Sequence, residues 1–178
     1  MKHRLVPILM AAALAGPAGL VAAAPHGHAH EHGVVRVQVG VDGPRLELAL
    51  QAPLDSLLGF ERAPRTDAER RAAEQALATL RQPQSWLQPD AAAGCTLETS
   101  NVDPGVLAPG APAPRDGHAE VEASYAWRCA QPQALRGLEI GLFDAFRRLQ
   151  RIEVEVADAN GQGRSTLKRP ARVVKLQR

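Results

Sequence analysis

Residues 34–51 have the sequence VVRVQVGVDGPRLELALQ, and the clearest structural pattern of the chain lies in this segment. Apolar side chains occupy alternate positions on both sides of the step from Asp42 to Gly43, namely Val35, Val37, Val39, Val41, Leu46, Leu48 and Leu50. A period of two residues is typical of a strand with one buried face, and Asp-Gly favours a tight turn. We therefore predict a β-hairpin whose valines and leucines share one face.

Residues 67–81 predict the main helix. Thr66 is a suitable N-cap, and Glu69 three residues later completes the reciprocal capping arrangement, while Pro83 prevents continuation far beyond Arg81. Helical spacing places one apolar stripe along this segment, formed by Ala72, Ala73, Ala76, Leu77 and Leu80. We expect this stripe to pack on the sheet, and the apolar segment 53–64 to fold back over the core.

Alternating apolar residues predict further strands at 95–102, 120–129, 138–142, 152–156, 164–168 and 172–176, with one helical turn at 144–149. The segment 103–117 contains four prolines and three glycines, a composition that favours a flexible surface loop. Several strands joined by short turns, with a separate helix, indicate the α+β class. We predict a mainly antiparallel β-sheet with one amphipathic helix packed on it, in a single domain over residues 34–178.

The N-terminus resembles a secretory signal peptide at residues 1–23. Lys2 and Arg4 precede an apolar, alanine-rich run, and small residues gather at positions 22–24. We place the cleavage after Ala23, with cleavage after Ala24 as the alternative. A transmembrane helix is the competing interpretation, but prolines and a glycine interrupt a run that is barely long enough to span. We therefore expect export, and no stable insertion in the membrane after cleavage.

The overall charge argues against nucleic acid as a partner. The chain has 21 Lys and Arg against 19 Asp and Glu, and cleavage would remove Lys2 and Arg4 without any acid, which leaves the mature protein formally neutral. The sequence contains no internal repeat and gives no indication of an oligomer. We found no Gly-x-Ser-x-Gly, phosphate-binding glycine loop or His-Glu-x-x-His motif, so we expect that the protein is not an enzyme.

The two cysteines, Cys95 and Cys129, predict a disulfide in an oxidising compartment. Each cysteine shares the inward face of its predicted strand. A bridge between positions 34 residues apart would stabilise the fold by about 3 to 4 kcal/mol. The alternative, a thiolate metal site, is disfavoured because the chain has no Cys-x-x-Cys motif.

Residues 24–33 form a histidine-rich N-terminal arm, with imidazoles on alternate residues at His26, His28, His30 and His32. In an extended arm, residues two apart face the same side, so all four rings can converge. Neutral imidazole nitrogens hold zinc, copper or nickel. We predict a Zn(II) site, with Cu(II) or Ni(II) as alternatives; an inert solvated tail is the competing interpretation.

His118 is the one histidine outside the arm in the mature sequence. On its own, such a histidine is more typical of a hydrogen-bonded surface residue than of a metal ligand. Together with a nearby arm, however, His118 could anchor a shared ion, with Glu31 or Glu61 as weaker ligands.

Three segments of the chain carry motifs of a known family. They are PLDSLLGFERAP at residues 53–64, GCTLE at 94–98 and HAEVEASYAWRC at 118–129. With these motifs and a His-Gly-His segment ahead of the valine hairpin, the sequence resembles the ZrgA-like zinc-regulated periplasmic proteins. It departs from their pattern at Arg62, where relatives tend to have a histidine, and at 103–117, where many carry a tract rich in His, Asp and Glu.

The resemblance implies a periplasmic zinc-binding accessory protein for zinc acquisition, which passes metal to an importer's periplasmic binding component. The matching positions are the four arm histidines and His118, with Glu61 as a weaker addition. A second class of function stays open, namely a periplasmic interaction module without a metal role that docks on a membrane transporter or another envelope partner.

Overall fold

The computed structural model describes residues 31–113 and 118–176. The described residues do not include His26, His28 and His30 of the arm, the predicted signal peptide at 1–23, or residues 114–117 of the proline-rich segment. None of the helices in the described ranges has the length and apolar character needed to cross a membrane.

The predicted hairpin is confirmed by strands β1 (Val34–Asp42) and β2 (Arg45–Pro53). They pair antiparallel, and their register sets Val37 opposite Leu50 and Val39 opposite Leu48. The valines and leucines of this face are buried. The turn between the strands requires Gly43, whose φ of 52° lies in the left-handed region that glycine adopts without strain.

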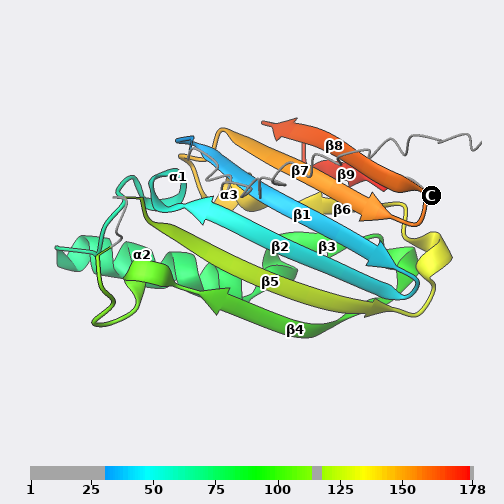
Figure 1. The fold of residues 1–178 in the computed structure, drawn as a ribbon, viewed down its shortest axis with the longest axis horizontal. Coiled ribbons are helices and arrows are strands. Elements are labelled where there is room, and N and C mark those ends of the chain that lie inside the picture. Colours follow the sequence, from blue (N-terminus) through cyan, green and yellow to red (C-terminus); the bar gives the residue numbers. More distant parts are fainter. Residues whose placement is uncertain (1–30, 114–117, 177–178) are drawn as a thin grey trace, which may run out of the picture.

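The hairpin lies at the centre of a six-stranded sheet with the order β4-β5-β2-β1-β7-β8 (Figure 1). The added strands are β4 (Cys95–Asp103), β5 (Glu120–Cys129), β7 (Arg151–Asp158) and β8 (Gly161–Lys168). Every pairing is antiparallel except that of β1 with β7, which is parallel. The mainly antiparallel α+β fold is therefore confirmed, with one parallel pair that alternation along the chain does not reveal.

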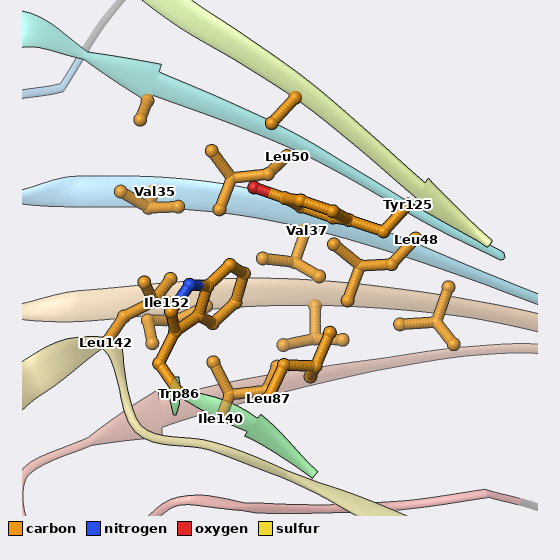
Figure 2. Close-up of a cluster of buried hydrophobic side chains, with 14 of the residues drawn as sticks. Val35, Val37, Leu48, Leu50, Trp86, Leu87, Tyr125, Ile140, Leu142 and Ile152 are labelled. Carbon is orange, nitrogen blue, oxygen red and sulfur yellow. The ribbon is translucent and has the colours of Figure 1, made fainter. Parts of the chain in front are cut away.

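A second sheet, which the sequence did not predict, closes the core. Its strands are β3 (Leu87–Pro89), β6 (Gly137–Ile140) and β9 (Val173–Lys175), in the order β3-β6-β9, and it lies behind the six-stranded sheet in Figure 1. Trp86 and Ile140 on this side pack in one buried cluster with Val37 and Leu48 of the larger sheet (Figure 2), and the ring centres of Trp86 and Tyr125 lie 5.6 Å apart. The Tyr125 hydroxyl donates to the Leu80 carbonyl at 2.8 Å, so its polar end is satisfied inside the core.

Helix α2 (Asp67–Arg81) has the predicted bounds, and both hydrogen bonds of its capping box at Thr66 and Glu69 are present. Four residues of the predicted stripe are buried, namely Ala73, Ala76, Leu77 and Leu80. Ala72 is exposed, because it lies at the margin of the stripe. A short helix α1 (Leu54–Leu58) precedes α2, and its buried Leu54 and Leu57 confirm that segment 53–64 folds back on the core.

The strand predicted at 138–142 ends earlier than expected, and the helical turn predicted at 144–149 was wrong in position. Leu142 does not extend the strand but begins helix α3 (Leu142–Ala145). Directly after Ile140, the amide of Gly141 donates to the Trp86 carbonyl at 2.6 Å, and the chain then turns so that Leu142 and Phe143 are buried in the core.

Short 3-10 turns connect the remaining elements, namely η1 (Pro83–Ser85), η2 (Ala91–Ala93), η3 (Gly105–Leu107) and η4 (Pro132–Ala134). Turn η3 lies in the proline-rich segment, and its Val106 is buried. A Cβ at Gly105 would lie 2.5 Å from the Glu120 carbonyl oxygen, so only glycine fits this close approach to β5. The flexibility of the segment as a whole stays a prediction.

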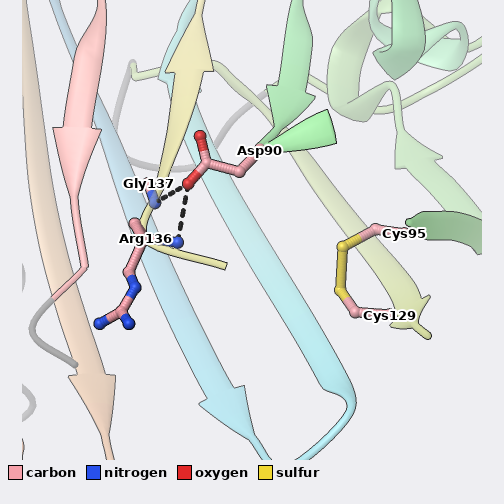
Figure 3. The surroundings of a disulfide bond; sticks show 5 residues. All are labelled: Asp90, Cys95, Cys129, Arg136 and Gly137. Carbon is pink, nitrogen blue, oxygen red and sulfur yellow. Dashed lines mark hydrogen bonds between the residues drawn. A yellow bond between two sulfur atoms is a disulfide. The ribbon is translucent and has the colours of Figure 1, made fainter. Parts of the chain in front are cut away.

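The disulfide between Cys95 and Cys129 is confirmed (Figure 3). The two cysteines are direct partners in the pairing of β4 with β5, and Cys129 is buried. At the same end of the molecule, one carboxylate oxygen of Asp90 accepts from the amides of Arg136 and Gly137, each at 2.7 Å. This end, which we call the disulfide end, therefore combines a covalent bond with a carboxylate that accepts two backbone hydrogen bonds.

Candidate metal centre

The opposite end of the six-stranded sheet gathers segments that are far apart in the sequence. Strands β1, β5 and β7 begin at this end and β2 finishes there, because β1 runs parallel to β7 and β2 antiparallel to β1 and β5. The register makes Val34 the partner of Arg151, and Pro53 the partner of Glu120. His32, helix α1 and His118 adjoin these strand ends, so the topology brings them together.

Glu61 is the centre of this end, which we call the histidine end. His32 Nε2 lies 3.8 Å from one Glu61 carboxylate oxygen, and His118 Nδ1 lies 3.3 Å from the other. The Glu61 side chain is 16% exposed, whereas those of His32 and His118 are 67% and 48% exposed. A largely buried carboxylate thus stands beneath two imidazoles that solvent reaches.

Asp55, on the first turn of α1, is a second carboxylate at this site. Its Oδ2 lies 3.7 Å from His32 Nδ1, and its side chain is 19% exposed. The two ring nitrogens of His32 therefore face two different carboxylates. On the other side of Asp55, Arg148 approaches Oδ1 at 3.6 Å.

Helix α1 is fastened to the neighbouring strands by backbone and side-chain hydrogen bonds. The Leu54 amide donates to the Ala119 carbonyl at 2.8 Å, next to His118. The buried Ser56 hydroxyl donates to the Val34 carbonyl at 3.1 Å, two residues beyond His32. These bonds hold α1 against the segments that carry His32 and His118.

The segment carrying His32 is held by Gly33, whose carbonyl accepts from the amides of Gln150 and Arg151 at 2.8 and 3.0 Å. Gly33 has a φ of 77°, which L side chains rarely adopt, so the turn that leads from His32 into β1 depends on glycine. His32 thus follows the placement of β1 and β7.

Glu61 stands between two anchored neighbours. The Arg62 guanidinium lies 5.0 Å from the centre of the Phe60 ring and donates to both carboxylate oxygens of Glu69, at 3.0 and 2.8 Å. Hydrogen bonding from Arg62 lowers the pKa of Glu69 to about 2, and bonding to Glu69 raises the pKa of Arg62. Arg62 is therefore engaged with α2 rather than with the site.

Glu31, a weaker predicted ligand, is directed elsewhere. Its carboxylate accepts from Arg151 at 2.5 Å, and Arg151 also bonds to Glu153 on β7. Bonding to Glu31, more than to Glu153, raises the pKa of Arg151. The structure does not bring Glu31 to Glu61.

Of the predicted site residues in the described part of the chain, the structure brings together His32, His118 and Glu61. Asp55 and Arg148 were missed. Asp55 stands six residues before Glu61 in an apolar segment, and that isolated carboxylate is the signal that could have identified it. For Arg148, which lies 93 residues beyond Asp55, the sequence offers no local signal.

The donor set fits a zinc ion in its chemistry. Imidazole nitrogen and carboxylate oxygen are both zinc ligands, and in a tetrahedral site with bonds of about 2.0 to 2.2 Å they lie about 3.4 Å apart. The separations of 3.3 and 3.8 Å about Glu61 are close to that value. The Glu61 Oε1 atom is buried and finds no hydrogen-bond donor among the described residues. Such an oxygen costs free energy that a cation would recover.

The site is incomplete in the described ranges. No group of three or more His, Cys, Asp or Glu side chains within residues 31–113 and 118–176 is already arranged to hold a metal ion. His32 and His118 each contact Glu61, and a closed tetrahedral site needs further ligands. The described residues therefore supply part of a site.

Comparison with known proteins gives one family. A family model described as ZrgA family zinc uptake protein matches residues 29–176, a range that begins inside the histidine arm and contains His32, Glu61 and His118. A search of curated proteins finds no match to the chain.

Proposed function

Since the chain belongs to the ZrgA family of zinc uptake proteins, we propose that it is a periplasmic zinc-binding accessory protein that holds Zn(II) between its N-terminal arm and the histidine end of the sheet. In this proposal residues 1–23 are a cleaved signal peptide, and the mature protein has no catalytic role. Sequencing of the exported protein should give Ala24 as the first residue. A mature chain that still begins at Met1 would contradict export by cleavage.

The observation that carries the proposal is the buried Glu61 oxygen, which has no hydrogen-bond donor among residues 31–113 and 118–176, beside the exposed imidazole of His32. His118 reaches the second oxygen of the same carboxylate. A zinc ion at this position would bind the buried oxygen and so remove the free-energy cost of leaving it without a partner.

The arm histidines His26, His28 and His30 directly precede His32 in the sequence, and we propose that they supply the ligands that the sheet end lacks. Binding then orders part of the arm, and the loss of conformational freedom lowers the net affinity. A moderate, reversible affinity suits a protein that passes zinc to an importer's periplasmic binding component. Cu(II) and Ni(II) also accept imidazole ligands, and Cu(II) is expected to bind more tightly in vitro.

Calorimetric titration of zinc into the mature protein at pH 7.5 tests the assignment. We expect one ion per chain, and an affinity that falls at least about tenfold in Glu61→Gln and in His32→Ala, since each removes a ligand. Glu98→Gln is the matched control, because Glu98 pairs with Arg128 at 2.6 Å on β4 and has no part in the site. Equal affinities in wild type, Glu61→Gln and His32→Ala would refute the site.

The titration also separates this function from a periplasmic interaction module that docks on a transporter without metal. Such a module would take up no zinc at neutral pH. Rescue of growth under zinc starvation would then be independent of the four arm histidines and of Glu61, whereas the metal function requires them.

A further inference from the structure

The two nitrogens of His32 face carboxylates that differ in their surroundings. Nε2 points to Glu61, whose near oxygen has no hydrogen-bond donor in the part of the chain that the structure describes, and Nδ1 points to Asp55 at 3.7 Å. In metal sites, a ligand histidine usually donates its second ring N–H to a carboxylate, which fixes the tautomer and makes the ligand nitrogen more basic. Asp55 occupies the position of such a carboxylate.

Asp55 is itself shared with a cation. Arg148 Nη2 lies 3.6 Å from Asp55 Oδ1, and Arg148 Nε donates to the Asp55 backbone carbonyl at 3.2 Å. The guanidinium lies against the C-terminal cap of α1 at Gly59, where an added Cβ would come within 2.8 Å of Arg148 Cζ. The absence of a side chain at residue 59 thus makes room for Arg148 beside Asp55.

We propose that Asp55 and Arg148 form a tuning pair behind His32, in which Asp55 is a positioning residue that strengthens zinc binding and Arg148 weakens it by acting on Asp55. The proposal rests on the function proposed above and concerns the affinity of the same site. The Arg148 charge offsets that of Asp55, so Asp55 supports the His32 imidazole less than an unshared carboxylate would. The consequence is a site that releases zinc more readily than its ligands alone would allow.

The size of the effect follows from the exposure of the pair. The Arg148 side chain is 57% exposed, so solvent screens its charge. We expect Arg148→Gln to tighten zinc binding about threefold to tenfold at low salt, and Asp55→Asn to weaken it by a similar factor. Both effects should shrink as ionic strength rises.

A double-mutant cycle on the mature protein tests the coupling. Zinc dissociation constants and dissociation rates are measured against a chromophoric chelator for wild type, Arg148→Gln, Asp55→Asn and the double variant. In the Asp55→Asn background, Arg148→Gln should change affinity by less than about twofold, because Arg148 acts through Asp55. Arg172→Gln is the matched control, since Arg172 pairs with Asp144 and Glu139 away from the site.

Spectroscopy supplies a readout that a purely structural role would not move. The nitrogen chemical shifts of His32 in the zinc-bound protein should indicate Nε2 as the ligand and a protonated Nδ1. Asp55→Asn should shift the Nδ1 resonance while the amide spectrum of the core stays unchanged.

Three results would overturn the tuning pair. The first is an Arg148→Gln protein that binds zinc no more tightly than wild type, and the second is an equal gain in Arg172→Gln. The third is a gain in Arg148→Gln that persists in full without Asp55. Failure of the proposed function looks different, because wild type would then bind no zinc, or Glu61→Gln would bind it as well as wild type.

Discussion

The two ends of the six-stranded sheet differ in the groups that surround their carboxylates. At the disulfide end, Cys95 is bonded to Cys129, one Asp90 oxygen accepts from two backbone amides at 2.7 Å, and Arg128 pairs with Glu98 at 2.6 Å. One Asp158 oxygen at this end is buried without a hydrogen-bond partner among the described residues, but the described histidines, His32 and His118, both lie at the other end. At the histidine end, Glu61 keeps a buried oxygen without a donor in the described residues, and its imidazole neighbours lie at 3.3 and 3.8 Å.

This difference separates stability from binding. The disulfide end gains its interactions within the chain as the protein folds. The histidine end holds Glu61 and its two imidazole neighbours at fixed positions, while one Glu61 oxygen lacks a hydrogen-bond donor among the described residues. A ligand can therefore bind there. We therefore expect substitutions at the disulfide end to lower the free energy of unfolding and leave the zinc affinity unchanged. Substitutions at the histidine end should lower the zinc affinity without lowering the free energy of unfolding.

The largest effect is expected from removing the disulfide. Replacement of both Cys95 and Cys129 by serine should lower the free energy of unfolding by about 3 to 4 kcal/mol, because the unfolded chain regains the freedom that the bridge removes. Urea denaturation of the metal-free mature protein measures the loss. At a temperature where the variant is folded, its zinc affinity should match that of wild type; a large loss of affinity would break the separation of the two ends.

Glu61→Gln should lower the zinc affinity without lowering the free energy of unfolding, the opposite of removing the disulfide. Alongside the loss of at least about tenfold in zinc affinity, the metal-free variant should be as stable as wild type or more stable by up to about 1 kcal/mol, since a neutral amide is less costly to bury than an unsatisfied carboxylate. Thermal and urea unfolding without metal provide the measurement. A metal-free variant that is clearly less stable than wild type would show that Glu61 serves the fold rather than a ligand.

Thr66→Ala tests whether a loss of stability close to Glu61 in the chain affects zinc binding. Thr66 is the N-cap of helix α2, which follows Glu61 in the sequence. Loss of the cap should reduce the free energy of unfolding by about 1 kcal/mol. The two hydrogen bonds from Arg62 to Glu69 remain and hold the residue next to Glu61. The zinc affinity should therefore stay within about twofold of wild type. A drop of tenfold in affinity would mean that the position of Glu61 depends on the cap.

The smallest effect concerns acid stability. The pKa of Glu69 falls from its ordinary value of 4.5 to about 2 in the folded protein, so its contribution to stability is complete above about pH 5 and is lost as the pH falls toward 2. Glu69→Gln should therefore be less stable than wild type at neutral pH, and the difference should vanish near pH 2. Urea unfolding at several pH values tests this; a difference that does not depend on pH would contradict the role of the ionised carboxylate.

Local sequence patterns predicted most of the individual helices and strands. The features that they did not predict depend on pairing between segments far apart in the chain. The bounds of α2 follow from Thr66, Glu69 and the proline at 83, and the hairpin follows from alternation around Asp42 and Gly43. Strand β3 has only three residues, too few to show a period, so the second sheet could not be predicted. The parallel pairing of β1 with β7 joins segments over 100 residues apart and likewise leaves no local pattern.

The site was predicted in part for the same reason. Histidine and glutamate were identified by their chemistry, and the structure brings His32, Glu61 and His118 together because three strand ends coincide. Asp55 stands in the motif at residues 53–64, but nothing in that motif indicates a contact with His32, and Arg148 stands in no motif. Both residues join the site only through the fold. The disposition of Glu31 toward Arg151 likewise depends on β7, which no property of residue 31 reveals.

In the proposed function, one zinc ion is shared between the arm and the histidine end. Calorimetric titration of zinc at pH 7.5 tests it on three mature proteins: wild type, His118→Ala, and a form with alanine at positions 26, 28 and 30. We predict one ion per wild-type chain and an affinity at least about tenfold lower in both variants. Undiminished affinity in either variant would contradict a shared site.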